Sequence, residues 1–183
     1  VGPVRKEIGI RTVFNILGPL TNPGKADRML LGVFREDYVE KIAKALITLG
    51  VHDAMVVYGL DGLDEISACG ETFVAEVRGE DIRYYTIKPE DFGFERVSKD
   101  ALKGGTPEEN AEITKAILSG GGTKAQKTAV ALNAGACIYV ENDGITLAQG
   151  IEKAEEIMSS GKGCEILQGF IKTTNGESLC QQF

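Results

Sequence analysis

The sequence of 183 residues lacks tryptophan and contains a single histidine and four cysteines. No two cysteines form a C-x-x-C pair, so the sequence predicts neither a zinc site nor a disulfide scaffold. No apolar stretch approaches the roughly 20 residues that span a bilayer. The first residues also lack the apolar segment of a signal peptide. These absences favour a protein of the reducing cytoplasm that has no membrane partner.

Positive charge is also in short supply, with 20 Lys and Arg against 27 Asp and Glu and a net charge of −7. This balance argues against nucleic acid or an anionic membrane as a partner, because phosphate backbones are bound mainly by Lys and Arg. Small phosphorylated ligands remain compatible with it, since a metal ion can supply the positive charge. A hydrophobic fraction of 43% is that of an ordinary globular domain with one sizeable core.

The apolar periodicity predicts an α/β fold. A buried strand, an amphipathic helix over residues 36–49 and a second buried strand follow one another within about 30 residues, which is typical of a parallel βαβ unit. Two alternating runs then predict an antiparallel hairpin that turns at Gly79. The predicted strands are 29–34, 54–58, 72–77 and 82–87. We therefore expect a central, mostly parallel sheet with an antiparallel hairpin, flanked by helices.

Helices dominate the second half of the chain, after a predicted loop at 88–93. Thr106, Pro107 and Glu109 form a strong helix start. Gly161 is expected to close the third of the predicted helices. Small residues in the second helix suit close packing on the sheet, and Cys137 is predicted to be a small core residue. The predicted helices are 106–118, 123–139, 146–158 and 163–172.

Three motifs that resemble functional sites are better explained by structure. The Gly-rich stretch 120–124 follows a helix and lacks Ser or Thr after its Lys, so it is read as a turn between helices and not as a phosphate loop. His52 lies in a helix-to-strand turn without a nucleophile motif and is expected on the surface. Cys69 has no basic neighbour in the sequence and is expected to pack, not to react.

The acidic loop, residues Asp61 to Glu65, contains three carboxylates directly behind the predicted strand 54–58. In α/β sheets, ligands bind in the crevice outside the carboxyl ends of the strands. Adjacent carboxylates such as Asp64 and Glu65 repel each other unless a cation neutralises them. Mg²⁺ takes one or two protein carboxylates together with substrate phosphates. Spacing alone leaves a metal site and a solvated acidic turn as alternatives.

A second unusual segment lies near the start of the chain. Arg5, Lys6 and Arg11 precede an apolar run, 13–23, that Gly and Pro interrupt. Arg is suited to bidentate capture of a carboxylate or phosphate. Ordinary solvated charges are the alternative that composition alone favours.

The motifs, taken in order, resemble those of a known family. The segment VRKEIGIRTVFNILGPLTNP is followed by MLLGVF, YGLDGLDEIS, YTIKPEDFGF, GGTPEENA and LNAGACIYV. This series is similar to the second half of the anthranilate phosphoribosyltransferases, over essentially the whole chain, and the match is weakest in the final dozen residues. The resemblance implies the C-terminal-domain fold of the nucleoside phosphorylases and phosphoribosyltransferases.

That family joins anthranilate to phosphoribosyl pyrophosphate (PRPP), giving N-(5-phosphoribosyl)anthranilate and pyrophosphate in tryptophan biosynthesis. The resemblance implies that Arg5 meets the anthranilate carboxylate and that Gly18 and Pro19 line the same pocket. It also implies that Asp64 and Glu65 hold Mg²⁺ against the pyrophosphate. Asp61 belongs to the motif without an assigned ligand role, and no residue is identified as a general base. Many members carry His at the position of Tyr58, so no role is transferred to that residue.

The resemblance also implies a division of the chain. Residues 1–28 correspond to a hinge and substrate-binding segment, and residues 29–183 to the α/β domain. The N-terminal helical domain of the family, with its usual homodimer contact, and its Gly-Thr-Gly-Gly-Asp PRPP loop have no counterpart in this sequence. We expect a piece of a longer enzyme that is inactive on its own, with its oligomeric state open.

Two alternative functions are compatible with parts of the sequence. A pyrimidine nucleoside phosphorylase-like enzyme shares the architecture but is not expected to combine the Arg5 segment with an Asp-Glu pair for a pyrophosphate-bound metal. A non-catalytic relative that binds nucleic acid is disfavoured by the net charge of −7.

Overall fold

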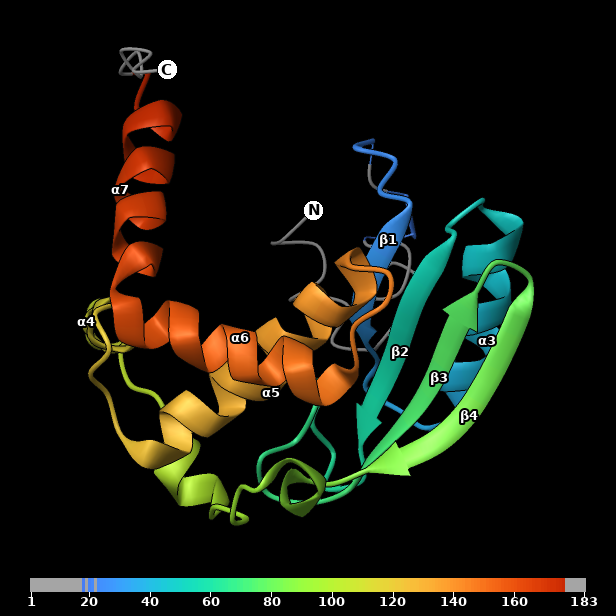
Figure 1. Ribbon diagram of the computed structural model, residues 1–183, viewed down its shortest axis with the longest axis horizontal. Helices are drawn as coiled ribbons and strands as arrows, with labels where there is room; N and C mark the ends of the chain where they lie inside the picture. The colour runs from blue at the N-terminus through green and yellow to red at the C-terminus, as the bar shows by residue number, and fades with distance from the viewer. Residues whose placement is uncertain (1–17, 19, 22, 177–183) are drawn as a thin grey trace, which may run out of the picture.

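A computed structural model describes residues 18, 20, 21 and 23–176 of the chain. Four strands come first, with one helix between the first two, and the rest of the described chain is helical (Figure 1). The strands are β1 (Arg28–Gly32), β2 (Asp53–Gly59), β3 (Thr72–Arg78) and β4 (Asp81–Ile87). The α-helices are α3 (Asp37–Thr48), α4 (Pro107–Leu118), α5 (Lys124–Glu141), α6 (Leu147–Ser160) and α7 (Lys162–Thr174), with short 3-10 turns η1 (Pro89–Phe92) and η2 (Lys99–Leu102).

The sheet has the order β1-β2-β3-β4. β1 and β2 pair in parallel, with Leu30 opposite Met55, which confirms the predicted βαβ unit. β3 pairs antiparallel with both β2 and β4, and the turn between β3 and β4 contains Gly79 at φ +59°, which confirms the predicted hairpin. The sheet is mixed: one of its three strand pairs is parallel, so "mostly parallel" overstated the parallel share.

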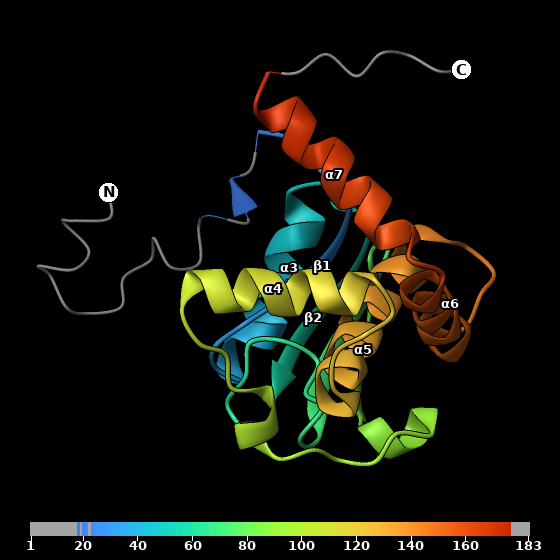
Figure 2. The same cartoon turned by 90° about the vertical axis from the view of Figure 1, so that its left-hand side faces the viewer.

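Helices cover both faces of the sheet. α3 lies against β2 and β3 on one face, and α5 lies against β1 and β2 on the other, with α6 packed beside α5 (Figures 1 and 2). β2 is consequently buried on both faces, with Ala54 and Val56 facing the α3 core and Met55 and Val57 facing the α5 core. A strand buried on both faces must be apolar at every position, which is why 54–58 is a continuous apolar run. α7 extends away from the sheet, as both views show.

Three helices begin with the same reciprocal cap, in which a Thr side chain and a Glu or Gln three residues later each accept a backbone N–H. The pairs are Thr106 with Glu109 for α4, Thr123 with Gln126 for α5, and Thr146 with Gln149 for α6. Such boxes satisfy N–H groups that the helix itself leaves free. The predicted start of α4 and the predicted end of α6 at Gly161 (φ +75°) are confirmed.

Two local predictions need correction. Cys137 was expected in the core but is exposed, because Ala136 and Val140 take the inward positions on α5 and a helix turns about 100° per residue. The predicted loop 88–93 contains the 3-10 turn η1. The small residues of α5 also serve a second contact: a Cβ at Gly135 would lie against the α6 backbone at Ile151, so glycine lets the two helices approach closely.

β1 forms one edge of the sheet, and within the described residues its only strand partner is β2. A groove of about 400 Å³ lies beside it on the α5 face, and one of about 450 Å³ on the α3 face. Met29 lines both grooves, joined by Ile138 in the first and by Leu49 in the second. The described residues include no helix long and apolar enough to cross a membrane.

Candidate functional site

The acidic loop lies where the sequence predicted, at the carboxyl end of β2 in the connection to β3, low in the view of Figure 1. Short backbone hydrogen bonds close the connection on itself. Gly59 N donates to Leu63 O at 2.9 Å, Gly62 N donates to Gly59 O at 2.8 Å, and Leu60 N donates to Glu71 O at 2.8 Å. The loop therefore has a defined shape that its own main chain holds.

Asp61 points into this loop and is used to build it. Its Oδ2 accepts a hydrogen bond from Ser67 Oγ at 3.0 Å. Lys99, on η2, donates its ammonium to the Asp61 carbonyl oxygen and lies 3.9 Å from Oδ2. These contacts give Asp61 a structural place in the motif and occupy oxygens that a metal would otherwise find free.

Ser67 and Thr72 fix the far side of the loop, and both are almost fully buried. Thr72 Oγ1 accepts from Ser67 N at 2.9 Å. Ser67 Oγ accepts from Cys69 N at 2.9 Å and from Gly70 N at 3.2 Å. Each buried hydroxyl thus pays its desolvation cost with hydrogen bonds, and the segment behind the acidic pair is rigid.

Asp64 and Glu65 differ from Asp61, because both are exposed. Among the hydrogen bonds and ion pairs of the described residues, neither side chain has a partner. Neighbouring protein atoms still remove part of the water around Glu65, and this desolvation, together with the charges of Asp64 and Asp61, raises the pKa of Glu65 above its ordinary value. Two uncompensated carboxylates side by side favour a bound cation.

Gly32, the last residue of β1, brings a second strand end to this place. A Cβ at Gly32 would overlap the carbonyl oxygen of Asp64, so only glycine allows the loop to cross at this height. The acidic pair therefore lies over the carboxyl ends of β1 and β2, two neighbouring parallel strands. This is the part of an open α/β sheet where ligands bind.

Asn133 of α5 also contacts the loop, directly behind Glu65. Its Oδ1 accepts from Ile66 N at 2.9 Å, and its Nδ2 donates to Ile66 O at 3.0 Å. Sequence reasoning gave no role to Asn133, Lys99 or Gly32. Asn133 and Gly32 do lie within motifs that carry the family resemblance, but their partners are distant in the sequence, so only the fold brings them together.

The donor set can be tested against a metal. The described residues contain no group of three or more His, Cys, Asp or Glu side chains that could hold an ion. A pair of carboxylates is too small a set for a closed structural zinc site. It does fit Mg²⁺, which commonly uses one or two carboxylates and completes its shell with water and substrate phosphates.

The other predicted site residues are only partly described. Arg5 and Pro19 lie outside the described residues, and their assignment to an anthranilate pocket stays a prediction. Gly18 is exposed, and a Cβ there would have no atom within 4 Å. This neither places Gly18 in a pocket nor removes it from one.

The three motifs that the sequence analysis assigned to structure have the surroundings predicted for them. His52 is exposed and contacts the carboxylate of Asp53 at 3.1 Å. Desolvation and the charge of Asp61 raise the pKa of Cys69, which disfavours its reactive thiolate. Gly120 to Thr123 connect α4 and α5, and Lys124 pairs with Glu95 at 2.7 Å.

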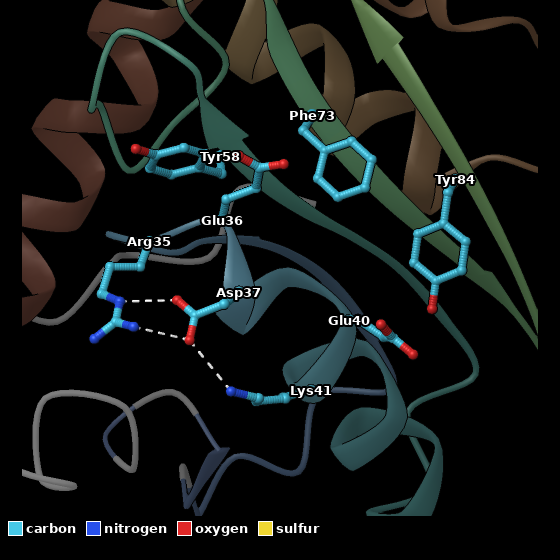
Figure 3. Close-up of a pocket in the computed structure, with 8 residues that line it drawn as sticks. All are labelled: Arg35, Glu36, Asp37, Glu40, Lys41, Tyr58, Phe73 and Tyr84. Atoms are coloured by element: carbon cyan, nitrogen blue, oxygen red, sulfur yellow. Dashed lines mark hydrogen bonds and ion pairs between the residues drawn. The ribbon is translucent and has the colours of Figure 1, made fainter.

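A groove of about 850 Å³ lies elsewhere, between α3 and the hairpin (Figure 3). Its lining residues are Arg35, Glu36, Asp37, Glu40, Lys41, Tyr58, Phe73 and Tyr84. Asp37 pairs with Arg35 at 2.8 Å and with Lys41 at 3.2 Å, so the cations there are already neutralised. We place the candidate site at the acidic loop instead, because the charges of Asp64 and Glu65 have no partner among the described residues. The size of a groove alone supplies no chemistry.

Comparison with known proteins identifies the family of the chain. Residues 1–164 match the family described as "Glycosyl transferase family, a/b domain". A curated relative, the anthranilate phosphoribosyltransferase of Deinococcus radiodurans, is 50% identical over 168 residues, which cover 92% of this chain and 49% of that protein. The chain spans about half the length of the curated relatives it matches.

Solved structures agree. The anthranilate phosphoribosyltransferase of Thermus thermophilus superposes with a TM-score of 0.84 at 42% identity, over 93% of this chain and 50% of that one. The Saccharomyces cerevisiae protein gives a TM-score of 0.85 at 30% identity, over 96% of this chain and 51% of that one. The yeast protein has been solved with PRPP and Mg, and separately with 4-fluoroanthranilate.

Proposed function

Because this chain belongs to the glycosyl transferase family through its a/b domain, we propose that it forms the metal- and pyrophosphate-binding half of an anthranilate phosphoribosyltransferase. The relatives of that name that match nearly all of this chain support the choice of reaction. The product would be N-(5-phosphoribosyl)anthranilate, an intermediate of tryptophan biosynthesis, and the compartment would be the cytoplasm.

One observation carries the proposal: Asp64 and Glu65 are exposed and have no side-chain partner among the described residues, yet they are held at fixed positions over two strand ends. In this proposal the pair holds Mg²⁺. The bound ion would neutralise charge that develops on the leaving pyrophosphate. Asp61, already bonded to Ser67, keeps the loop in shape and does not contact the ion.

The remaining roles fall to the first segment. Arg5 would orient anthranilate through its carboxylate, with Gly18 and Pro19 beside the aromatic ring. Orientation and desolvation of the amine are sufficient to make it a nucleophile, because glycosyl transfer passes through a cationic, oxocarbenium-like state. The proposal therefore assigns no general base to this chain.

We also propose that residues 1–28 act as a hinge and substrate-binding segment attached to the α/β domain at 29–183. The phosphoribosyl-binding groups would be supplied by the half of the relatives that this chain does not match. The 183-residue chain alone is then expected to have no measurable transferase activity. Homodimer formation is likewise expected only when that half is present.

The test joins residues 1–183 to the preceding half of the Deinococcus radiodurans relative, and follows the loss of anthranilate in the presence of PRPP and Mg²⁺. We expect activity from the joined protein and none from the chain alone. Asp64→Asn should raise the Mg²⁺ requirement at least tenfold, and Arg5→Ala should raise the KM for anthranilate. Glu155→Gln removes a comparable exposed charge from α6 and serves as the matched control.

Three results would contradict the proposal. Transferase activity of the 183-residue chain alone would show that the missing half is dispensable. A joined protein that splits thymidine with phosphate and ignores anthranilate would favour the pyrimidine nucleoside phosphorylase reading. A salt-dependent shift of DNA by the chain would instead favour a nucleic-acid-binding relative.

A further inference from the structure

Asn133 occupies an unusual position for its residue type, the interior of the long helix α5. Asn is a weak helix former, because its side chain competes for backbone hydrogen bonds. Here the amide uses its acceptor and both of its donor hydrogens: Oδ1 accepts from Ile66 N, and Nδ2 donates to Ile66 O and to Ala129 O, each within 3.0 Å. The side chain is anchored to its own helix and holds a loop 67 residues away.

The contact with Ile66 grips the loop at two points. A side-chain amide presents one donor and one acceptor in a single plane, as a neighbouring strand would, so it can satisfy both the N–H and the C=O of one residue. A carboxylate has no donor for the carbonyl, and a hydroxyl cannot span both groups. The grip fixes the peptide units on both sides of Ile66, including the one that begins at Glu65.

A contact with an edge strand of the sheet completes the arrangement. The carbonyl oxygen of Asp64 lies against Gly32 at the end of β1, too close for any side chain at residue 32. The Ile66 side chain is buried in the core beneath. Asp64 and Glu65 are thus held between β1 and α5 through their backbone, while no side chain of the described residues pairs with their carboxylates.

Such support has a physical purpose. Two like charges on adjacent residues would move apart in a flexible loop, because nothing in the described residues neutralises them. A cation site needs both oxygens in place before the ion arrives, since ordering them on binding lowers affinity. Metal ligands are often kept in place by a surrounding set of hydrogen bonds, and loss of such a bond typically costs 10- to 100-fold in affinity.

We propose that Asn133 is a positioning residue for the metal site: by clamping the backbone at Ile66 it sets the separation of the Asp64 and Glu65 carboxylates, without touching the ion. This inference rests on the proposed metal role of that pair. It adds a residue from a different element, α5, to the groups on which metal binding depends.

The test uses Mn²⁺ as a paramagnetic probe that shares the oxygen ligands of Mg²⁺, titrated into the 183-residue chain. Asn133→Leu keeps the number and branching of the side-chain heavy atoms but removes the hydrogen bonds to Ile66, and we expect Mn²⁺ to bind about tenfold more weakly. Asn142→Leu is the matched control, because Asn142 ends the same helix and its amide donates only to Ile138 O, at 2.8 Å. Mn²⁺ affinity in this control should be unchanged.

Asn133→Ser serves as a second variant that adds no apolar bulk, and it should weaken Mn²⁺ binding in the same direction. Amide exchange at Ile66 should be faster in both Asn133 variants, at a temperature where circular dichroism matches that of the parent chain. A purely structural Asn133 would lower the melting temperature and leave Mn²⁺ affinity of the folded protein unaltered.

The outcomes separate the inference from the function on which it rests. If Asp64→Asn weakens Mn²⁺ binding and neither Asn133 variant does, the positioning role is overturned and the metal site stands. If the parent chain binds no Mn²⁺ at millimolar concentration, or if Asp64→Asn leaves binding intact, the metal site fails and the inference fails with it.

Discussion

A pair of carboxylates lies near each end of β2, and the two pairs differ in burial and in the partners of their side chains. At the start of β2, Asp53 and its neighbour Glu76 on β3 are buried, each with about 3% of its surface exposed. Beyond the end of β2, Asp64 and Glu65 are exposed and lack partners within the described residues. Identical chemical groups are structural where the fold supplies compensating cations and available for binding where it does not.

The buried pair is enclosed by donors. Asp53 lies 3.2 Å from Arg78 and 3.6 Å from Arg28, and Glu76 lies 3.2 Å from Arg78 and 2.7 Å from Arg83. The hydroxyl of Tyr139 on α5 also donates to Glu76, at 2.5 Å. Burial alone would raise the pKa of both carboxyls, but hydrogen bonds from His52 and Arg78 to Asp53, and from Tyr139 and Arg83 to Glu76, outweigh it and leave both pKa values below the ordinary range. The network ties α5 to the sheet.

The largest loss of stability is expected when a cation is removed from the buried pair. Arg78→Met leaves Asp53 and Glu76 with fewer partners, and an uncompensated buried charge typically costs 3–5 kcal/mol, so we expect a loss of about 3 kcal/mol in the free energy of unfolding, measured with urea. Arg83→Met, at a far more exposed side chain, should cost less than about 1 kcal/mol. Equal losses in the two variants would show that burial is not the deciding factor.

A smaller loss of stability is expected when a side chain is added at Gly32, against the acidic loop. Gly32→Ala would place a methyl group on the Asp64 carbonyl, and such overpacking typically costs about 1–3 kcal/mol. The loop must move to accept it, so Mn²⁺ affinity should fall together with stability. Gly18→Ala, at a position with open space, is the control. An unchanged Mn²⁺ affinity in Gly32→Ala would mean that ion binding does not depend on the position of the acidic loop relative to β1.

Acid should act on the buried pair in one direction. Because the folded pKa values of Asp53 and Glu76 lie below their ordinary values of 3.8 and 4.5, their contribution to stability is present above those values and is lost as the pH falls through the folded ones. The free energy of unfolding should therefore decline below about pH 4.5. The decline should be shallower in Glu76→Gln, measured from its own value at pH 7; an equally steep decline would assign it to other carboxylates.

Glu65, one member of the exposed pair, should respond in the opposite sense and by the smallest amount. The folded pKa of Glu65 is raised, so its ionisation opposes folding once the pH exceeds the ordinary value of 4.5. Glu65→Gln should stabilise the chain by a few tenths of a kcal/mol at pH 7, after allowance for solvent screening, and by nothing near pH 3. Its Mn²⁺ binding should nevertheless be lost. Destabilisation at pH 7 would place Glu65 with the structural carboxylates.

The sequence predicted the exposed carboxylates beyond the end of β2, but not the buried pair near its start. The run 54–58 and the carboxylates behind it located β2, its carboxyl end and the metal candidates Asp64 and Glu65. The periodicities of α3 and the hairpin were equally legible, because each reflects a face that must be buried. Asp53 gave no such signal, since a carboxylate before a strand looks like an ordinary turn residue until Arg28 and Arg78 are brought beside it.

The contacts that the sequence did not predict share one physical cause, which is the distance in sequence between the partners. Asn133 bonds a residue 67 positions away, and Lys99 reaches one 38 positions away. Cys137 was placed in the core because its neighbours are apolar, whereas helix rotation decided the matter in favour of Ala136. Local patterns determine which elements form, while the support of the site depends on which elements meet.

The open edge of the sheet has a practical consequence for handling the chain. Within the described part of the chain, one edge of β1 has no strand partner and lies between two grooves that share Met29, and an open strand edge is a template on which another copy can add a strand. What opposes this is the net charge of −7, whose repulsion acts only over the screening length of the buffer. Colloidal stability of the isolated chain should therefore fall as salt is added, so low ionic strength is the preferred condition for its purification.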